Sequence, residues 1–423
     1  MLKSSAKRMK FRRAKRATLI AGLVLGSSLW AATLQSGLPG YSSRVWHIQD
    51  GLPEDTIQAA PTPVDLESPL DYQVFQRQSN VSGVILAAGH ARVKCDRIEE
   101  RLVGNSLSGM LPGNWQSLAM DPGSGAFRDE IKTPAGGWYR MEFRLITNGK
   151  TVATIEVSHV GMGEVFVVAG QSNSTNYGEV RQQTRTGMVA AWSADGWRLA
   201  NDPQPGVQDA SQKGSFIPAF GDALYEKIRV PVGVVSVGHG STSVRQWLPA
   251  GDRFDIPPTM GKFVRSVGAD QWESDGILFN GMMKPIRQFG RCGFRALLWH
   301  QGESDAHQSP DHAIPGEEYA RLLERIIRAS REQAGWDFPW FVAQVSYHSP
   351  SDPSSAPIRE AQKSLWQSGI AFEGPDTDQL TGDNREKGGK GVHLSDKGLQ
   401  AHGRLWAAKV EPYLNAVLNC LMV

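Results

Sequence analysis

A short apolar stretch that runs directly into a polar turn constrains the fold of this chain more than any other feature. Val165–Ala169 is uninterrupted apolar sequence, and Gly170, Gln171, Ser172 and Asn173 follow it at once. Such a run, bounded by a glycine, is typical of a strand that a parallel sheet buries on both faces. Because ligands bind at the carboxyl ends of strands in open α/β sheets, we expect this turn to lie at a functional site.

The chain from residue 161 onward alternates apolar strands with helical periodicities. Strands are expected at Val165–Ala169, Val232–Val237, Phe294–Trp299 and Phe338–Val345. Helices are expected at Phe216–Ile228, over Tyr319 to Ile327, at Ile358–Trp366, and from Ser395, an N-cap candidate, through Val410. This alternation predicts an α/β domain whose parallel sheet carries helices on both faces.

Residues 67–160 have a different pattern, in which apolar and polar residues alternate. Tyr72–Gln76 and Trp138–Leu145 both alternate, and Asn148-Gly149 separates the second run from Thr151–Val157. An Asn-Gly pair between two alternating runs is the strongest short signal for a β-hairpin. We therefore predict a small, all-β, sandwich-like domain ahead of the α/β domain.

The first 36 residues have the order of an export signal. The first 17 residues hold eight of the 45 Lys and Arg and no acidic residue, and the apolar run Ala17–Leu34 follows. This order predicts a cleaved signal peptide and therefore a periplasmic or extracellular protein. The alternative is an uncleaved membrane anchor, which is the only association with a membrane that we expect.

Residues 37–66 are rich in Gly, Pro and Asp without periodicity, and we interpret them as a linker. Within them, Arg44–Ile57 resembles the opening of the repeat in sensor-type β-propellers. A propeller needs several repeats to bury its faces, and no second copy follows. We therefore treat this segment as an isolated fragment.

Charge and motif spacing exclude some classes of function. Without the first 17 residues the chain has 37 basic against 43 acidic residues, so electrostatics give no support for a nucleic-acid partner. The order His300-x-x-Glu303 is not the H-E-x-x-H of a zinc site. We expect neither a metal nor an organic cofactor.

Ser172 is a candidate nucleophile, although an ordinary turn serine has the same surroundings. A serine becomes a nucleophile when a base and an oxyanion hole stand beside it. The sequence is not G-x-S-x-G, so the nucleophile elbow of α/β-hydrolases is not predicted.

Three later segments hold groups that would complete such a site. Gly240 lies in a Gly-rich turn after an expected strand, where backbone N–H groups approach a ligand closely. His300, Gln301 and Glu303 follow another strand and offer an imidazole, an amide donor and a carboxylate. His393 lies on a Gly-rich loop before the last helix and is either a base or a surface histidine.

Taken in order, these segments resemble the SGNH/GDSL hydrolases. The blocks are Gly170-Gln171-Ser172-Asn173, Gly240-Ser241-Thr242-Ser243, His300-Gln301-Gly302-Glu303-Ser304 and His393. The nearest branch is the sialate O-acetylesterase and acetylxylan esterase-like carbohydrate acetylesterases. The resemblance implies an SGNH-type three-layer α/β/α domain over residues 161–423.

The resemblance also implies roles for individual residues. Ser172 would be the nucleophile and His393 the general base. The oxyanion hole would use the Ser172 N–H, a backbone N–H near Gly240 and the Gln301 side chain. Asn173, Trp247 and His300 are weaker candidates for contacts with the substrate.

Two positions depart from the family pattern. Many members have Asp three residues before the base, where this chain has Lys390, and a lysine cannot accept the imidazole N–H. Glu303 is the expected substitute, with Asp383 and Asp305 as alternatives. Ser241 stands where the branch commonly has a second glycine, which leaves the backbone donor near Gly240 open.

The reaction expected from the resemblance is hydrolysis of O-acetyl, or another short acyl, esters on a poly- or oligosaccharide. The alternative is a carbohydrate-binding or scaffold protein on the same fold that has lost activity, and Lys390 is the residue that favours it. The sequence does not identify the natural ester.

Overall fold

The computed structural model describes residues 62–420. The predicted signal peptide and nearly all of the predicted linker, including residues 44–57, lie outside this range. Within residues 62–420 no helix combines the length and the apolar character needed to cross a membrane. The described chain is mixed α/β with large sheets.

The first part of the described chain is β-rich. Its strands are β1 (Val64–Ser68), β2 (Gln73–Gln76), β3 (Ser82–Ala91), β4 (Arg97–Val103), β5 (Asn105–Ser106), β6 (Gly109–Met110), β7 (Gln116–Ser117), β8 (Ala126–Pro134) and β9 (Gly136–Thr147). β1, β3 and β8 form one antiparallel sheet, while β4 and β5 pair with β9. Ile85, Phe143 and Leu145 belong to one buried cluster that these strands share. The first three residues of β1 lie within the segment that we interpreted as a linker.

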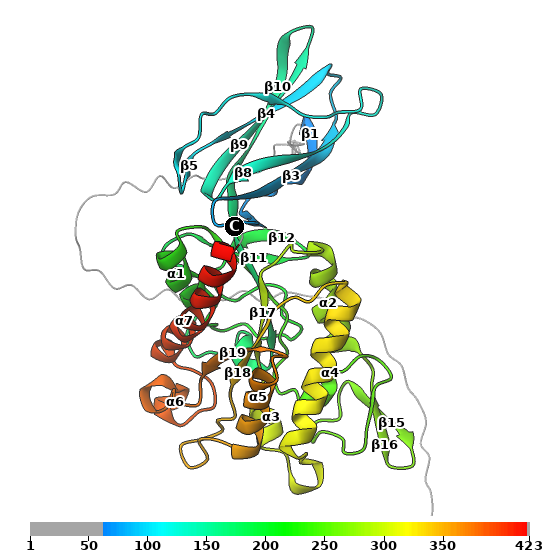
Figure 1. Ribbon diagram of the computed structural model, residues 1–423, viewed down its shortest axis with the longest axis vertical. Helices are drawn as coiled ribbons and strands as arrows, with labels where there is room; N and C mark the ends of the chain where they lie inside the picture. The colour runs from blue at the N-terminus through cyan, green and yellow to red at the C-terminus, as the bar shows by residue number, and fades with distance from the viewer. Residues whose placement is uncertain (1–61, 421–423) are drawn as a thin grey trace, which may run out of the picture. The chain divides into compact units, whose positions relative to one another are not determined.

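The predicted hairpin is confirmed. β9 ends at Thr147 and β10 (Lys150–Gly170) begins after Asn148 and Gly149, whose φ angles of 51° and 76° match a tight hairpin turn. β10 pairs with β9 through its first part and continues, as one strand, into a parallel sheet (Figure 1). The boundary predicted at residue 160 therefore falls inside a strand, and the division into two domains stays a prediction.

The parallel sheet has the order β12-β11-β13-β10-β17-β18-β19. Its other strands are β11 (Val189–Ser193), β12 (Gly196–Leu199), β13 (Val232–Ser236), β17 (Ala296–His300), β18 (Trp340–Gln344) and β19 (Phe372–Asp376). All neighbours are parallel except β11 and β12, which form an antiparallel pair at the edge. β10 and β17 are parallel neighbours in the middle of the sheet. Their carboxyl ends therefore lie next to each other.

Helices cover both faces of this sheet (Figure 1). On one face α1 (Ile217–Ile228) and α7 (Asp396–Cys420) bury Phe220 and Trp406 against strand residues such as Phe166. On the other face lie α2 (Ile277–Phe289), α4 (Gly316–Ala334) and α5 (Ala356–Gln367). The amphipathic spacing of these helices supplies each buried stripe.

Short elements complete the chain after the parallel sheet begins. They are η1 (Ser172–Ser174), η2 (Val244–Trp247), α3 (Glu303–Ala306), η3 (Pro310–His312), η4 (Gly382–Asn384) and α6 (Glu386–Gly389). A small antiparallel sheet is formed by β14 (Arg253–Phe254), β15 (Val264–Gly268) and β16 (Gln271–Ser274). Most of these elements lie in loops at the carboxyl ends of the parallel strands.

The four strands and four helices that the sequence predicted beyond residue 161 are present. Ser395 caps α7 as expected, because its hydroxyl accepts the Gly398 N–H at 3.2 Å. The prediction missed β11, β12 and β19, which are short, and α2. Gly281 and Pro285 lie inside α2, where both residue types count against a helix.

Candidate active site

A glycine brings two strand ends together at the start of the site. Gly170, the last residue of β10, pairs with His300, the last residue of β17. A Cβ at Gly170 would lie 2.1 Å from the His300 carbonyl oxygen, and the φ angle of 130° is one that other residues rarely adopt. The Gln171 N–H donates to the same carbonyl at 2.9 Å. The turn that carries Ser172 is therefore fixed directly to the end of β17.

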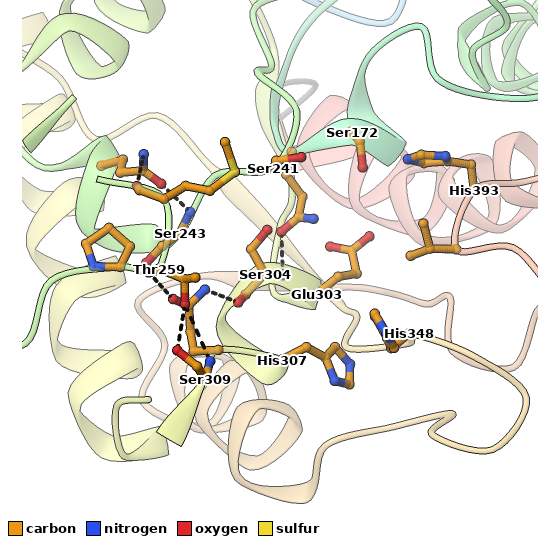
Figure 2. A pocket seen from close by; sticks show the side chains of 16 residues that line it. Ser172, Ser241, Ser243, Thr259, Glu303, Ser304, His307, Ser309, His348 and His393 are labelled. Atoms are coloured by element: carbon orange, nitrogen blue, oxygen red, sulfur yellow. Dashed lines mark hydrogen bonds between the residues drawn. The ribbon is translucent and has the colours of Figure 1, made fainter. Parts of the chain in front are cut away.

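A cavity of about 610 Å³ opens at these strand ends. Its size is within the usual range for a small-molecule site. Figure 2 shows the side chains that line it. They are Gln171, Ser172, Ser241, Ser243, Gln246, Pro258, Thr259, Met260, Glu303, Ser304, His307, Gln308, Ser309, His348, Val392 and His393. Twelve of these sixteen residues carry a hydroxyl, amide or imidazole group, which can form hydrogen bonds with a polar ligand.

Ser172 and His393 line the same cavity, although they lie far apart in sequence (Figure 2). Ser172 is 5% exposed, and its hydroxyl makes no hydrogen bond with any residue between 62 and 420. Figure 2 shows the His393 ring on the side of the cavity where the Ser172 hydroxyl lies. The two predicted reactive groups are therefore brought together.

His393 contacts a glutamate that the sequence analysis did not select. Its Nδ1 lies 3.0 Å from Oε1 of Glu386, which is almost fully buried. The backbone holds the pair together, because the Glu386 N–H donates to the His393 carbonyl at 3.0 Å. Burial lowers the pKa of His393, while Glu386 opposes this shift. At neutral pH the ring is therefore unprotonated and able to accept a proton at Nε2.

Glu303 does not contact His393 in the way that we expected. Its Oε1 accepts a hydrogen bond from Asn173 Nδ2 at 2.9 Å, and its Oε2 is buried with no partner in the described chain. Burial raises the pKa of Glu303 to about 7. The Nδ1 position that we assigned to it is occupied by Glu386, which is nearer in sequence and shares the loop of His393.

The two alternative carboxylates are also engaged elsewhere. Asp305 accepts from Ser243 Oγ at 2.6 Å, from the Val244 N–H at 2.8 Å and from Gln301 Nε2 at 2.7 Å. Asp383 is exposed and lies 3.4 Å from Lys397 Nζ. Neither carboxylate reaches His393 in this structure.

Two of the three expected oxyanion donors are bonded to other groups. The Gly240 N–H donates to Asp209 Oδ2 at 2.6 Å. The Gln301 amide, which is fully buried, donates to Asp305 and to the Thr242 carbonyl at 2.9 Å. As the structure stands, both donors are satisfied away from the cavity. Ser241, with a φ angle of 58°, lines the cavity instead, and its N–H has no acceptor within residues 62–420.

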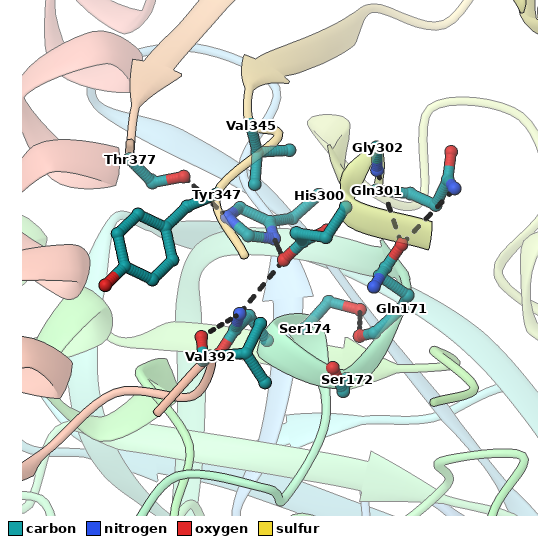
Figure 3. Close-up of polar contacts among 12 residues, drawn as sticks. Gln171, Ser172, Ser174, His300, Gln301, Gly302, Val345, Tyr347, Thr377 and Val392 are labelled. Carbon is teal, nitrogen blue, oxygen red and sulfur yellow. Dashed lines mark hydrogen bonds and ion pairs between the residues drawn. The ribbon is translucent and has the colours of Figure 1, made fainter. Parts of the chain in front are cut away.

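The three weaker substrate contacts do not line the cavity. Asn173 joins two parts of the site, because its Nδ2 contacts Glu303 and, at 3.3 Å, the Val392 carbonyl. Trp247 is fully buried, donates to Thr242 Oγ1 at 3.0 Å and packs edge-on against Trp299. His300 is buried beneath the turn, with Nε2 2.9 Å from Thr377 Oγ1 (Figure 3).

One aromatic residue beside the predicted motifs contacts His393. The Tyr177 ring stacks on the His393 ring at 5.1 Å between centroids. Glu386 was missed because no fixed spacing connects it to the histidine. The signal that was available is an acidic residue in the same Gly-rich loop, seven positions before His393.

Comparison with known proteins identifies the family of this chain. The family model described as "Carbohydrate esterase, sialic acid-specific acetylesterase" matches residues 162–411, which is more than half of the chain. The chain belongs to this family of carbohydrate esterases. Its similarity covers every residue discussed above from Ser172 to His393.

Individual relatives are distant. "Probable carbohydrate esterase At4g34215" of Arabidopsis thaliana is 23% identical over 215 residues, which cover 45% of this chain and 71% of the relative. The solved structure of XAC1771, described as a novel carbohydrate acetylesterase from Xanthomonas citri, is 16% identical. That alignment has a TM-score of 0.49 and covers 81% of this chain and 73% of the other.

Proposed function

We propose that this protein is a serine esterase that removes acetyl groups from O-acetylated carbohydrate, with Ser172, His393 and Glu386 as its catalytic residues. The observation that carries the proposal is a shared cavity together with one contact. Ser172 and His393 line one cavity, and Nδ1 of His393 lies 3.0 Å from Glu386 Oε1. A serine, a base and a carboxylate that orients the base are the groups that nucleophilic acyl transfer requires.

The reaction proceeds in two halves. Ser172 Oγ attacks the acetyl carbon while its proton passes to Nε2 of His393. This attack converts the acetyl carbonyl into a tetrahedral oxyanion. His393 then protonates the departing sugar oxygen as the C–O bond breaks, and the acetyl group remains on Ser172. A water molecule gives its proton to His393, attacks this acyl-enzyme, and acetate leaves as the proton returns to Ser172.

Glu386 accepts the Nδ1–H of His393 and stabilises the charged ring that forms in each half. Two features suit this role, the burial of its side chain and the backbone hydrogen bond that joins it to His393. Lys390 favoured an inactive protein because it cannot accept the imidazole N–H. Glu386 supplies that acceptor, so the argument for inactivity loses its basis.

We propose that the acetyl group is carried by a sugar, because the cavity lining offers groups that can bond sugar hydroxyls. The hydroxyls of Ser241 and Ser304 make no hydrogen bond within the described residues, so they are free to bond sugar hydroxyls. The family to which the chain belongs acts on carbohydrate esters. We propose an acetylated poly- or oligosaccharide as substrate without a choice among acetylated glycans.

Further proposals concern the whole chain. The parallel sheet with helices on both faces supports an SGNH-type three-layer domain over residues 161–423, and the strands before it support a separate β-sandwich-like domain over 67–160. The basic and apolar start of the sequence supports export with signal cleavage. N-terminal sequencing of the exported protein tests the last point, and an intact Met1 contradicts it.

Replacement of the nucleophile tests the proposed function. Ser172→Ala is expected to lower kcat for 4-nitrophenyl acetate, and acetate release from acetylated xylan, by roughly 10³-fold or more. Ser351→Ala changes an exposed serine away from the cavity and serves as the matched control. A Ser172→Ala protein that keeps more than a tenth of the wild-type rate contradicts the assignment.

A further inference from the structure

The side chain of Gln171 is held in one orientation beside Ser172. Its Oε1 lies 3.0 Å from the Ser304 N–H nitrogen, 3.3 Å from Gln301 Nε2 and 3.4 Å from the Gly302 N–H nitrogen. The two backbone N–H groups donate to this oxygen, whereas both hydrogens of Gln301 Nε2 go to nearer acceptors, Asp305 Oδ2 and the Thr242 carbonyl. Since an amide nitrogen accepts no hydrogen bond, these contacts fix which end of the amide is the oxygen.

The other end of the same amide faces the cavity. Gln171 is 4% exposed and lines the cavity together with Ser172. Its Nε2 has no acceptor within residues 62–420, and this nitrogen is not fully buried. It is therefore accessible from the cavity. Figure 3 shows the oxygen directed at Gly302 and Gln301 and the nitrogen on the opposite side. A pre-oriented donor therefore faces the cavity that Ser172 also lines.

We infer that Gln171 is a catalytic residue whose Nε2 donates a hydrogen bond to the oxyanion of the tetrahedral intermediate. This inference rests on the proposed function. The donors expected at Gly240 and Gln301 are bonded to Asp209, Asp305 and the Thr242 carbonyl. The side chain of Gln171 is oriented by the backbone N–H groups of Ser304 and Gly302. A donor fixed before the reaction stabilises the developing charge without reorganisation.

The variant Gln171→Glu separates this catalytic role from a structural one. Glutamate has nearly the same shape and keeps an oxygen for the two backbone donors, but in its ionised form it offers no hydrogen to an oxyanion. We expect kcat for 4-nitrophenyl acetate to fall about 10²–10³-fold, with KM changed only a few-fold. The thermal unfolding midpoint should stay close to that of the wild type.

A pH profile provides a second readout. The carboxyl group that Gln171→Glu introduces has, when protonated, an O–H that donates, so the activity of this variant relative to wild type should rise as pH falls. Protonation of His393 lowers kcat in both proteins, so its effect cancels when the activity of the variant is divided by that of the wild type. Should Gln171→Glu fail to fold, Gln171→Met takes its place, because it is similar in volume, uncharged and unable to donate.

Gln308→Glu is the matched control, because it adds the same charge to another glutamine that lines the cavity. Its amide donates to the Ser304 carbonyl and is not directed at Ser172. A loss of at least tenfold more kcat in Gln171→Glu than in Gln308→Glu supports the inference. Equal losses, or a Gln171→Glu protein with kcat within threefold of wild type, overturn it while the proposed function stands. A wild-type protein with no esterase activity overturns the proposed function itself.

Discussion

Two histidine–glutamate pairs lie within one site, and they have opposite character. His393 and Glu386 are hydrogen-bonded at 3.0 Å beside the cavity, whereas Nδ1 of His300 is 3.9 Å from Oε1 of Glu303 beneath the nucleophile turn. The first pair exposes a ring nitrogen to a ligand. The second is almost completely buried, and His300 Nδ1 and Glu303 Oε2 have no partner in the described chain.

Burial explains the difference between the pairs. It lowers the pKa of His300 to about 3 and raises the pKa of Glu303 to about 7. Removal from water raises the free energy of the charged form of each group. At a separation of 3.9 Å the attraction between the two charges does not offset this cost. The same two residue types therefore form a hydrogen-bonded pair beside the cavity, to which we assign proton transfer, and a buried polar pair beneath the turn.

The largest expected difference is between the two histidines. His393→Gln should lower kcat for 4-nitrophenyl acetate by about 10³-fold or more, because no base remains to accept the Ser172 proton. His300→Gln should change kcat less than tenfold and instead lower the thermal midpoint, because it alters a buried contact with Thr377. Equal losses of kcat in two folded variants would remove the distinction between the pairs.

The two glutamates should differ in the same direction, with a smaller effect. Glu386→Gln should lower kcat by about 10²–10⁴-fold, since the amide cannot stabilise the charged ring. Because Glu386 raises the pKa of His393, its loss should also move the acid limb of the kcat profile to lower pH. Glu303→Gln keeps an oxygen for Asn173 and should stay within about tenfold of wild type.

The pH profiles of both variants decide this comparison. An acid limb that moves in Glu303→Gln but not in Glu386→Gln would assign the orienting role to Glu303, as the sequence first indicated. Kinetics at saturating substrate between pH 4 and pH 9 provide the measurement.

The smallest effect concerns stability. The pKa of Glu303 rises from about 4.5, its ordinary value, to about 7 in the folded protein, so the folded state binds the proton more tightly. The contribution of this group to wild-type stability is therefore lost as pH rises through that window. Glu303→Gln stays neutral, and its stability relative to wild type should increase by roughly 1–3 kcal/mol between pH 4 and pH 8.

Urea unfolding at both pH values measures this change. Ionisations that the two proteins share, such as that of His300, cancel in the difference. A difference in unfolding free energy that stays constant with pH would show that Glu303 titrates near its ordinary value.

Local sequence was enough to predict the elements that hold the site. The run Val165–Ala169, the turn at Asn148-Gly149 and the N-cap at Ser395 each carry their structure in a few consecutive residues. Backbone preference and side-chain periodicity act over that distance. The order of the motif blocks also selected Ser172 and His393, which the fold brings to one cavity.

The partners of those groups were decided by tertiary structure alone. Which carboxylate reaches His393, and which amide is free to face the cavity, depends on where loops from different strands meet. Glu303 and Gln301 carry suitable groups, but burial beneath the turn engages one amide with Asp305 and leaves one carboxylate beside Asn173. A hydrogen bond is made or lost over a fraction of an ångström, and sequence spacing fixes no distance between segments that are far apart in the chain.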